Sequence, residues 1–458
     1  MKTQPLGVVL MSSLVGCTIV GQDYTEPKIT VPSTFVGAQA NPLMEAASVT
    51  WWRDLGDPLL NEIVGNGLDQ NFDIRIALER IKAAEAGLRR TGLNAQVEGD
   101  VTGDARRGRI ADGDINNEEF GSANAAFVFD LFGGFRRGTE ASLARLDAAN
   151  LDVGTVRLAY LADVVGSYIS ARYFQTATAI TRRSIASRRE TLDFVERRVA
   201  AGEATSLESA QARSLLATAE ASLPGLQANY QANVFRIATL INQPAANVLN
   251  RMNRGGSQPR PRRNGSTGIP ADLLRNRPDV KAAEREFAAT VADIGVAEAQ
   301  LYPSLELIGN VTSLGPGSTW AFGPSITIPL LSLPLRTANR DIAISRAREA
   351  ELIYRQQVVQ SVEETQSSLA FTNFQRRQVN SYSVATGAAR DVVNLSRTSY
   401  ENDTVTIIDL LDAERTLLFN ELELALSRRD WATSWTRLQV SVGKGWLAGV
   451  PEVQVAAN

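Results

Sequence analysis

Residues 400–415, YENDTVTIIDLLDAER, join two long runs of helix-forming sequence at a short break. Directly after the break, Asp409, Asp412 and Arg415 follow one another at intervals of three residues. Residues three and four apart share a face of a helix, so these charges lie on neighbouring turns. A diluted copy of the stretch, VAAGEATSLESAQAR, occupies residues 199–213. The two copies predict two equivalent corners, each joining a pair of helices.

The runs that flank these corners predict unusually long helices. No proline occurs from residue 59 to 223 or from 335 to 450, and residues 137–198 and 336–399 consist largely of Ala, Leu, Arg, Glu, Gln and Ser. A helix of about 60 residues is ~90 Å long, which is typical of a coiled coil or a helical tube. A further helix is expected over residues 58–91, with Pro58 in its first turn.

After the later corner, apolar residues form two stripes with spacings of three and four, as in a heptad repeat. One stripe contains Ile408, Leu411, Leu418 and Leu422, and the other contains Leu410, Ala413, Leu417 and Leu424. Two stripes indicate neighbours on two sides, as in a closed ring of helices. A soluble filamentous coiled coil explains the helices equally well, but it does not explain the segments between them.

Those segments alternate polar and apolar residues with period two, which is the signal of a β-strand. Each is about 10 residues long, the length of a transmembrane strand. The apolar side chains would face lipid, and the polar ones would line a lumen: Glu98, Asp100, Asp104, Glu306 and Asn310. Residues 106–117 are expected to form an exposed hairpin tip, and Trp320 and Phe322 suit an interfacial aromatic girdle. A half-buried sheet on a soluble core would show the same alternation.

Four strands in one chain cannot close a barrel, and no open sheet edge survives in lipid. Closure therefore needs other chains: two chains would supply eight strands, and three would supply twelve. The larger barrel would leave a lumen. Rings of Glu and Asp facing that lumen would favour cations.

The chain is organised as two similar halves. Residues 57–250 and 269–446 each predict the order helix, hairpin, long helix, corner, helix. Between them, residues 251–268 are rich in Arg, Gly, Pro and Ser, which is typical of a linker. Its five arginines are not interleaved with aromatic residues, so a solvated connector is expected and not a nucleic-acid site. Residues 447–458 form a C-terminal tail.

The N-terminus predicts export and lipid attachment. Residues 1–16 combine Lys2 with a short apolar run, as in a secretory signal peptide. Cys17 follows Leu14, Val15 and Gly16 and is similar to the lipidated first residue of a bacterial lipoprotein. An ordinary signal peptide with an incidental cysteine is the alternative. The Pro- and Thr-rich stretch that follows makes residues 17–56 an extended, lipidated N-terminal segment.

Composition excludes several classes of function. The 458 residues carry a formal net charge of −3, which gives no global reason to expect nucleic acid. There is no His, the commonest general base and metal ligand. Cys17 is the only cysteine, which excludes an internal disulfide and a thiolate metal cluster. No nucleophile–base pair is visible, so neither an enzyme nor a cofactor is expected.

The combined order of elements resembles the TolC/OprM outer-membrane channel family, and within it the NodT-type lipoproteins of tripartite efflux systems. The resemblance covers nearly the whole mature chain. It is carried by Cys17, by Trp51 and Trp52 followed by DPL at 57–59, by GIPADLLRNRPDVKAAERE at 268–286, by YPSL at 302–305, by LLDAERTLL at 410–418 and by the end at 443–446.

The resemblance implies a membrane protein of α+β class. Long antiparallel helices of a homotrimer would form a periplasmic α-helical tube, and two β-hairpins per chain would contribute to a trimeric 12-stranded outer-membrane β-barrel. The partners implied are outer-membrane lipid, a periplasmic membrane-fusion adaptor and an inner-membrane pump of the resistance-nodulation-division (RND) type. Such proteins are passive ducts, anchored in the outer membrane and extending into the periplasm.

The resemblance also assigns a periplasmic gate to the later corner. Asp409 and Asp412 match paired acids that narrow the opening, Tyr400 and Arg415 match positions that tie neighbouring helices, and Ile408 matches an apolar constriction. Like carboxylates gathered around a three-fold axis would also recruit cations. The alternative is that both aspartates are solvated acids at a helix N-terminus, with Thr406 as a simple N-cap.

Two positions depart from the family pattern at this corner. Val405 stands where some members have Arg, and Asp403 replaces a corner glycine that the first copy keeps as Gly202. The expected function is an efflux duct for small molecules. A duct for type I protein secretion and a non-conducting, lipid-anchored structural coiled coil are the alternatives.

Overall fold

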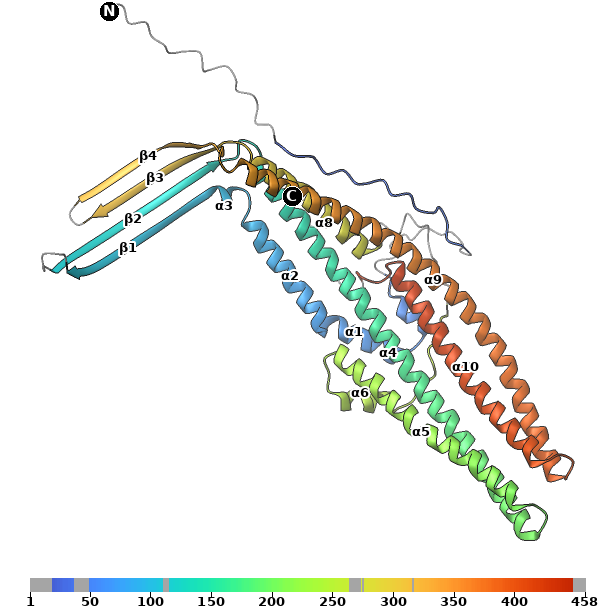
Figure 1. Cartoon of the computed structure of the whole chain (residues 1–458). Coiled ribbons are helices and arrows are strands. Elements are labelled where there is room, and N and C mark those ends of the chain that lie inside the picture. The colour runs from blue at the N-terminus through green and yellow to red at the C-terminus, as the bar shows by residue number, and fades with distance from the viewer. Residues whose placement is uncertain are drawn as a thin grey trace, which may run out of the picture. The chain divides into compact units, whose positions relative to one another are not determined.

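The computed structural model describes residues 19–36, 49–109, 115–262, 273, 276–314 and 317–447 (Figure 1). The chain folds into two compact units, each assembled from separate segments. One unit comprises Met1–Ile29, Leu78–Leu151 and Val280–Gln357, and the other comprises Thr30–Ala77, Asp152–Asp279 and Val358–Asn458. None of the described helices is long and apolar enough to cross a membrane.

The first unit contains a four-stranded antiparallel sheet in the order β1-β2-β3-β4. Its strands are β1 (Val97–Arg109), β2 (Ile115–Phe129), β3 (Ser304–Leu314) and β4 (Gly317–Thr327) (Figure 1). One row of paired residues runs from Asp100 through Asn124 and Asn310 to Ala321. Paired residues of antiparallel strands point to the same face. The register therefore places the predicted lumen residues together on one face: Glu98, Asp100, Asp104, Glu306 and Asn310.

The expected hairpin tip over residues 106–117 is too long. Arg106 pairs with Glu118 and Arg107 with Asn117, so both strands continue into this stretch. Only residues 110–114 lie between the two strands, and they fall outside the described residues. Polar composition led to the wrong boundary, because the backbone can pair whatever the side chains are.

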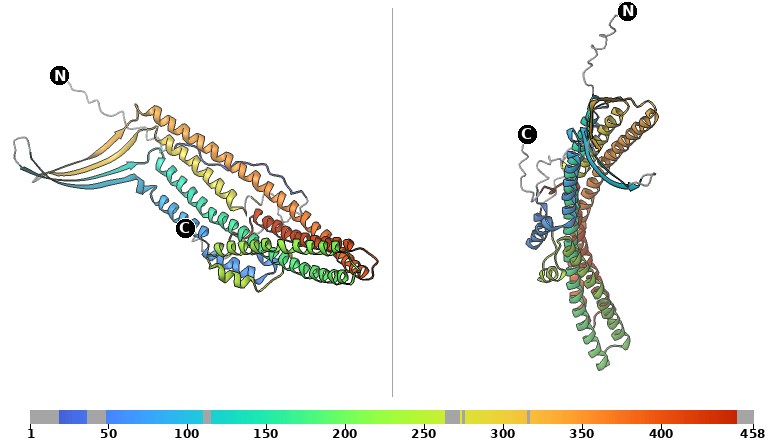
Figure 2. Two further views of the ribbon diagram at one scale, coloured as in Figure 1. Left: turned by 60° about the horizontal axis from the view of Figure 1, so that its bottom comes forward. Right: turned by 90° about the vertical axis from the view of Figure 1, so that its left-hand side faces the viewer.

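The long helices are present with nearly the expected bounds. They are α4 (Gly134–Ala201) and α9 (Leu333–Glu401), followed across a corner by α5 (Ser206–Leu240) and α10 (Ile407–Ser441), respectively (Figure 2). The remaining helices described are η2 (Trp51–Leu55), α1 (Pro58–Gln70), α2 (Phe72–Arg89), α3 (Leu93–Gln96), α6 (Ala245–Met252) and α8 (Pro278–Ala299).

The single helix expected over residues 58–91 is wrong, because Asn71 divides it into α1 and α2. The Asn71 side chain accepts hydrogen bonds from the backbone N–H groups of Asp73 and Ile74, at 2.9 and 3.1 Å. It also donates to the carbonyl of Leu240 at 2.9 Å. Asn71 thus caps a new helix while its backbone is extended, and Asn is among the preferred residues for this role.

Tryptophans centre the core of the second unit. Trp51 and Trp435 are almost fully buried and meet edge to face, with ring centroids 5.8 Å apart. The Trp51 indole N–H donates to the carbonyl of Lys444 at 3.0 Å. Gly445, at φ +93°, lies against Trp51, where a Cβ would be 3.0 Å from the indole nitrogen. The C-terminal turn and the tryptophan motif near residue 51 therefore form one packed cluster.

Lys444 is a charged residue in this packed region, with 8% of its surface exposed. Its ammonium group donates to Gln439 Oε1 at 3.1 Å. Burial lowers the pKa of Lys444 to about 8, and the negative charge of Asp54 opposes that shift.

We predict that the Lys444→Met variant loses this titration. The unfolded chain binds more protons than the folded chain between pH 8 and about 10.4, since the folded pKa lies below the ordinary value. The wild type should therefore gain unfolding free energy relative to Lys444→Met as the pH rises through this range, by on the order of 3 kcal/mol. Urea unfolding followed by Trp fluorescence measures the difference. A constant difference contradicts the prediction, and Lys82→Met at an exposed site is the control.

Candidate functional site

The later corner is built from a left-handed residue followed by a capped helix. Asp403 adopts φ +56°, and the Thr404 N–H donates to the Ser399 carbonyl at 2.9 Å. Thr406 then caps α10 in a capping box with Asp409. Asp409 Oδ2 accepts from the Thr406 backbone N–H at 3.0 Å and from its hydroxyl at 2.7 Å. These hydrogen bonds lower the pKa of Asp409 and favour its ionised form. The capping box also fixes the point at which α10 begins after the break.

The first corner uses the same devices. Gly202 adopts φ +77°, and Thr205 forms a capping box with Glu208 at the start of α5. Asp403 therefore occupies the left-handed position that Gly202 fills in the first copy. Asp tolerates this conformation better than most residues with a side chain.

The two corners are tied to each other through Tyr400. This residue is 4% exposed, and its hydroxyl donates to Glu208 Oε2 at 3.2 Å. Arg198 donates to the Tyr400 carbonyl at 3.3 Å, lies over the Tyr400 ring at 5.2 Å and forms an ion pair with Asp403. Burial, followed by the nearby charge of Glu208, raises the pKa of Tyr400. Tyr400 of α9 thus contacts both sides of the first corner, Arg198 before it and Glu208 after it.

Val405, which departs from the family pattern, packs against an apolar cluster at this corner. The buried members of the cluster are Val195, Tyr400, Ile407 and Leu410. An apolar side chain fits here because the polar tie is made elsewhere in the corner, by Arg198.

The other proposed gate residues lie on the exposed side of α10. Asp412 forms an ion pair with Arg415 three residues later, and both side chains are more than half exposed. Ile408 is 59% exposed, although its neighbour Ile407 is buried. Within one chain, Asp409, Asp412 and Arg415 therefore share a surface, whereas Tyr400 belongs to the buried tie. Among the described residues, no group of three or more acidic side chains is placed to hold a metal ion.

Glu414 is a polar residue of this region that sequence reasoning missed. It is 5% exposed, and its Oε1 atom accepts from Thr191 at 2.9 Å, from Arg397 at 3.1 Å and from Ser187 at 3.3 Å. One carboxylate thereby joins α4, α9 and α10. The spacing of Glu414 could have indicated its burial, because it lies four residues after the buried Leu410 and on the same helix face. The Glu414 carboxylate is buried, whereas the Arg397 side chain is 36% exposed, so the three helices are joined here by a partly buried network of hydrogen bonds.

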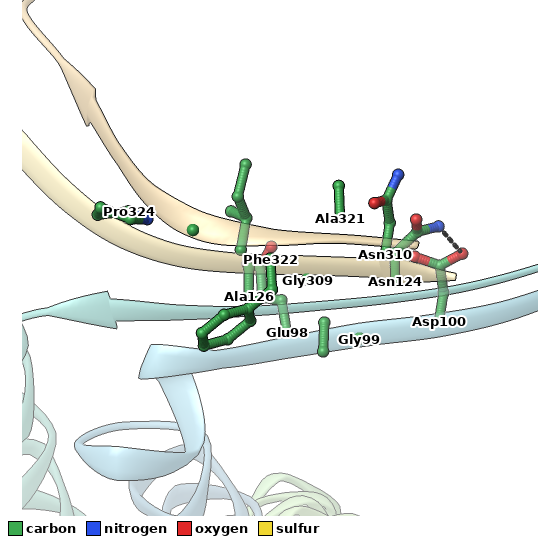
Figure 3. Close-up of a pocket in the computed structure, with 13 residues that line it drawn as sticks. Glu98, Gly99, Asp100, Asn124, Ala126, Gly309, Asn310, Ala321, Phe322 and Pro324 are labelled. Carbon is green, nitrogen blue, oxygen red and sulfur yellow. Dashed lines mark hydrogen bonds between the residues drawn. The ribbon is translucent and has the colours of Figure 1, made fainter. Parts of the chain in front are cut away.

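A shallow hollow of about 590 Å³ lies along the sheet and is lined by residues of both faces, such as Asp100 of the polar face and Phe322 of the other (Figure 3). Asn124 Nδ2 donates to Asp100 Oδ2 at 3.3 Å, and Asn310 lies next to them in the same row. The hydroxyls of Thr102 and Ser122 are 2.7 Å apart. Asn124 was not among the predicted lumen residues, because its own strand alternates less clearly. Cys17, the proposed lipid attachment point, lies outside the described residues.

Comparison with known proteins agrees with this arrangement. A model of the outer membrane efflux protein family matches residues 64–243 and 269–444. Nodulation protein T of Rhizobium leguminosarum bv. trifolii is 32% identical, with 97% of both chains covered. Outer membrane protein OprJ of Pseudomonas aeruginosa is 26% identical, with 98% of both chains covered.

Solved structures of outer-membrane channels share the fold. The structure of the outer-membrane channel OprN aligns with a TM-score of 0.82 at 29% identity, covering 93% of this chain and 99% of that one. Given the match of the family model over both halves of the sequence, this chain belongs to the outer membrane efflux protein family.

Proposed function

We propose that this chain is the passive outer-membrane duct of a tripartite efflux system, through which small molecules leave the periplasm. The similarity to an outer-membrane channel over 93% of the chain carries this proposal, because it covers the sheet and the long helices together. A periplasmic membrane-fusion adaptor and an inner-membrane RND pump would be its partners. The duct itself would bind no cofactor and catalyse no reaction. Single-channel recording of the purified protein in planar bilayers tests the proposal, which a folded but non-conducting protein would refute.

The two faces of the sheet support a shared barrel. The face opposite the polar row presents exposed apolar side chains, among them Val101, Trp320 and Phe322. Strands β1 and β4 end the sheet, and their unpaired backbone groups would need partners in a membrane. Three chains would close twelve strands, with Glu98, Asp100, Asp104, Glu306 and Asn310 facing the lumen. In this proposal, residues 57–250 and 269–446 are structural repeats, which their similarly capped corners support.

A pair of neighbouring substitutions tests the assignment of the two faces. Val101→Arg should place a charge in lipid and cost about 2–4 kcal/mol, whereas Thr102→Arg should face water and be tolerated. The yield of heat-modifiable oligomer in outer-membrane fractions reports barrel assembly. Equal yields from the two variants, or the reverse order, contradict the assignment.

The later corner is proposed as the periplasmic gate. Asp409, Asp412 and Arg415 occupy an exposed surface of α10, and Ile408 lies beside them. Three copies of this surface around one axis would gather carboxylates, which repel each other unless cations or Arg side chains lie between them. Tyr400 would act differently, as the tie that holds the later corner against the first. The gate thus combines an exposed acidic ring with a buried restraint.

We predict that replacing Asp409 and Asp412 together with Ala raises the single-channel conductance and weakens block by divalent cations. Loss of the like-charged ring removes the cation site and relaxes the constriction. Glu401→Ala, at an exposed acid of the same corner, is the matched control. If the double variant forms a folded oligomer with unchanged conductance, Asp409 and Asp412 do not form the gate.

Lipid attachment at Cys17 is proposed from the residues that precede it. More than one acyl chain gives firm anchoring, since each buried methylene contributes about 0.8 kcal/mol. Cells fed labelled palmitate should yield a labelled wild-type protein and an unlabelled Cys17→Ser variant. Label that survives the substitution places the lipid elsewhere.

A further inference from the structure

The first described residues after Cys17 belong to the first unit and are held there by hydrogen bonds. The Val20 N–H donates to the Phe132 carbonyl at 3.1 Å. Arg137, whose side chain is 6% exposed, donates to the Val20 and Gly21 carbonyls, both at 3.2 Å, and to Asp23 at 2.8 Å. One buried guanidinium therefore fixes the segment at three points.

Glycines allow this segment to approach closely. Gly21 adopts φ +88°, and a Cβ on it would lie 2.5 Å from the Cα of Gly295. Gly133 adopts φ +79°, and a Cβ on it would lie 2.8 Å from Cγ2 of Ile19. Ile19 thus rests directly on the connection between β2 and α4. Ile19 therefore packs against Gly133, and the Gly21 backbone packs against Gly295 of α8.

An apolar pocket of about 240 Å³ lies next to the contact between Ile19 and Gly133. Phe132 and Gly134, the two neighbours of Gly133, both line it. Residues 128–132 and 296–304 supply most of the remaining wall. Two aromatic residues of the wall, Phe132 and Tyr302, stack on each other, with ring centroids 4.5 Å apart and ring planes inclined by 18°.

The charged groups of the pocket already have protein partners. Asp130 accepts from the backbone N–H groups of Phe135 and Arg136, at 3.2 and 3.1 Å. Arg336 donates to the Gln300 carbonyl at 2.6 Å and to the Ser332 hydroxyl at 3.2 Å. These groups leave an apolar interior, which suits a hydrocarbon chain better than a charged or polar ligand.

We infer that this pocket receives an acyl chain of the lipid attached to Cys17, an inference that rests on the proposed lipidation. Two residues of extended chain span at most ~7 Å, so a lipid attached two residues before Ile19 has the reach to enter the pocket beside that residue. A short tether makes binding intramolecular and raises the effective concentration of the attached chain. An acyl chain of a free phospholipid lacks this advantage.

Photocrosslinking in intact cells tests the inference on the full-length protein. Cells are fed palmitate with a diazirine in its chain and irradiated, and peptides joined to the N-terminal lipopeptide are identified by mass spectrometry. Crosslinks should concentrate on residues 128–135 and 296–304. If a labelled lipopeptide crosslinks mainly to β4, residues 317–327, the acyl chain does not bind in the pocket, although the lipidation stands. An N-terminal peptide without label would overturn the lipidation as well, which distinguishes the two failures.

Variants separate the occupants of the pocket. Val296→Trp should fill the pocket and reduce these crosslinks at least fivefold, whereas Val291→Trp, on the same helix but outside the pocket lining, should leave them unchanged. In Cys17→Ser, exported with a signal peptide that does not lead to lipidation, the crosslinks of any palmitate-derived lipid to residues 128–135 and 296–304 should fall at least tenfold. Their persistence would assign the pocket to membrane phospholipid and overturn the inference. The wild-type crosslink map decides the question even if the Trp variants do not fold.

Discussion

The need to pair every backbone N–H and C=O group shapes this protein more than any other constraint. Helices α4 and α9 pair these groups internally, and accordingly α4 contains no proline and α9 has one only in its first turn, at Pro334. At the corners, the side chains of Thr205 and Thr406 accept hydrogen bonds from backbone N–H groups at the starts of α5 and α10. The sheet pairs these groups between strands, except at the outer edges of β1 and β4, which would need partners from other chains in a membrane. Oligomerisation in a membrane would thus follow from backbone chemistry.

The two corners share one architecture but differ in the charges that they carry. Both have a left-handed residue and a capping box, so the turn itself is equivalent in each copy. The later corner adds Asp412 and Arg415 on an exposed surface, while Glu414 on the same helix is buried against α4 and α9. Exposed charges are accessible to a neighbouring chain, whereas the buried carboxylate holds the helices within one chain. The proposed gate and the cohesion of the helices therefore reside on different faces of α10.

Sequence reasoning failed where local chemistry was ambiguous. The break at Asn71 was missed because Asn is merely neutral in a helix until its side chain finds partners, here including the distant Leu240 carbonyl. The hairpin tip is shorter than its composition suggested, because residues 106–109 and 115–117, most of them polar, still pair as strands. The buried role of Glu414 had a detectable spacing, but its partners Ser187 and Thr191 lie more than 200 residues away in the sequence.

The sequence by itself determined the types of element and the faces that they present. Period two predicted the strands and the shared face of Asp100 and Asn310, and the long runs without proline predicted the long helices. Only the tertiary structure decided which distant groups meet: Tyr400 with Glu208, Thr191 with Glu414, and Arg137 with the segment that follows Cys17. The physical reason is that periodicity is a local property of the chain, whereas the burial and pairing of a charge depend on packing between elements far apart in sequence.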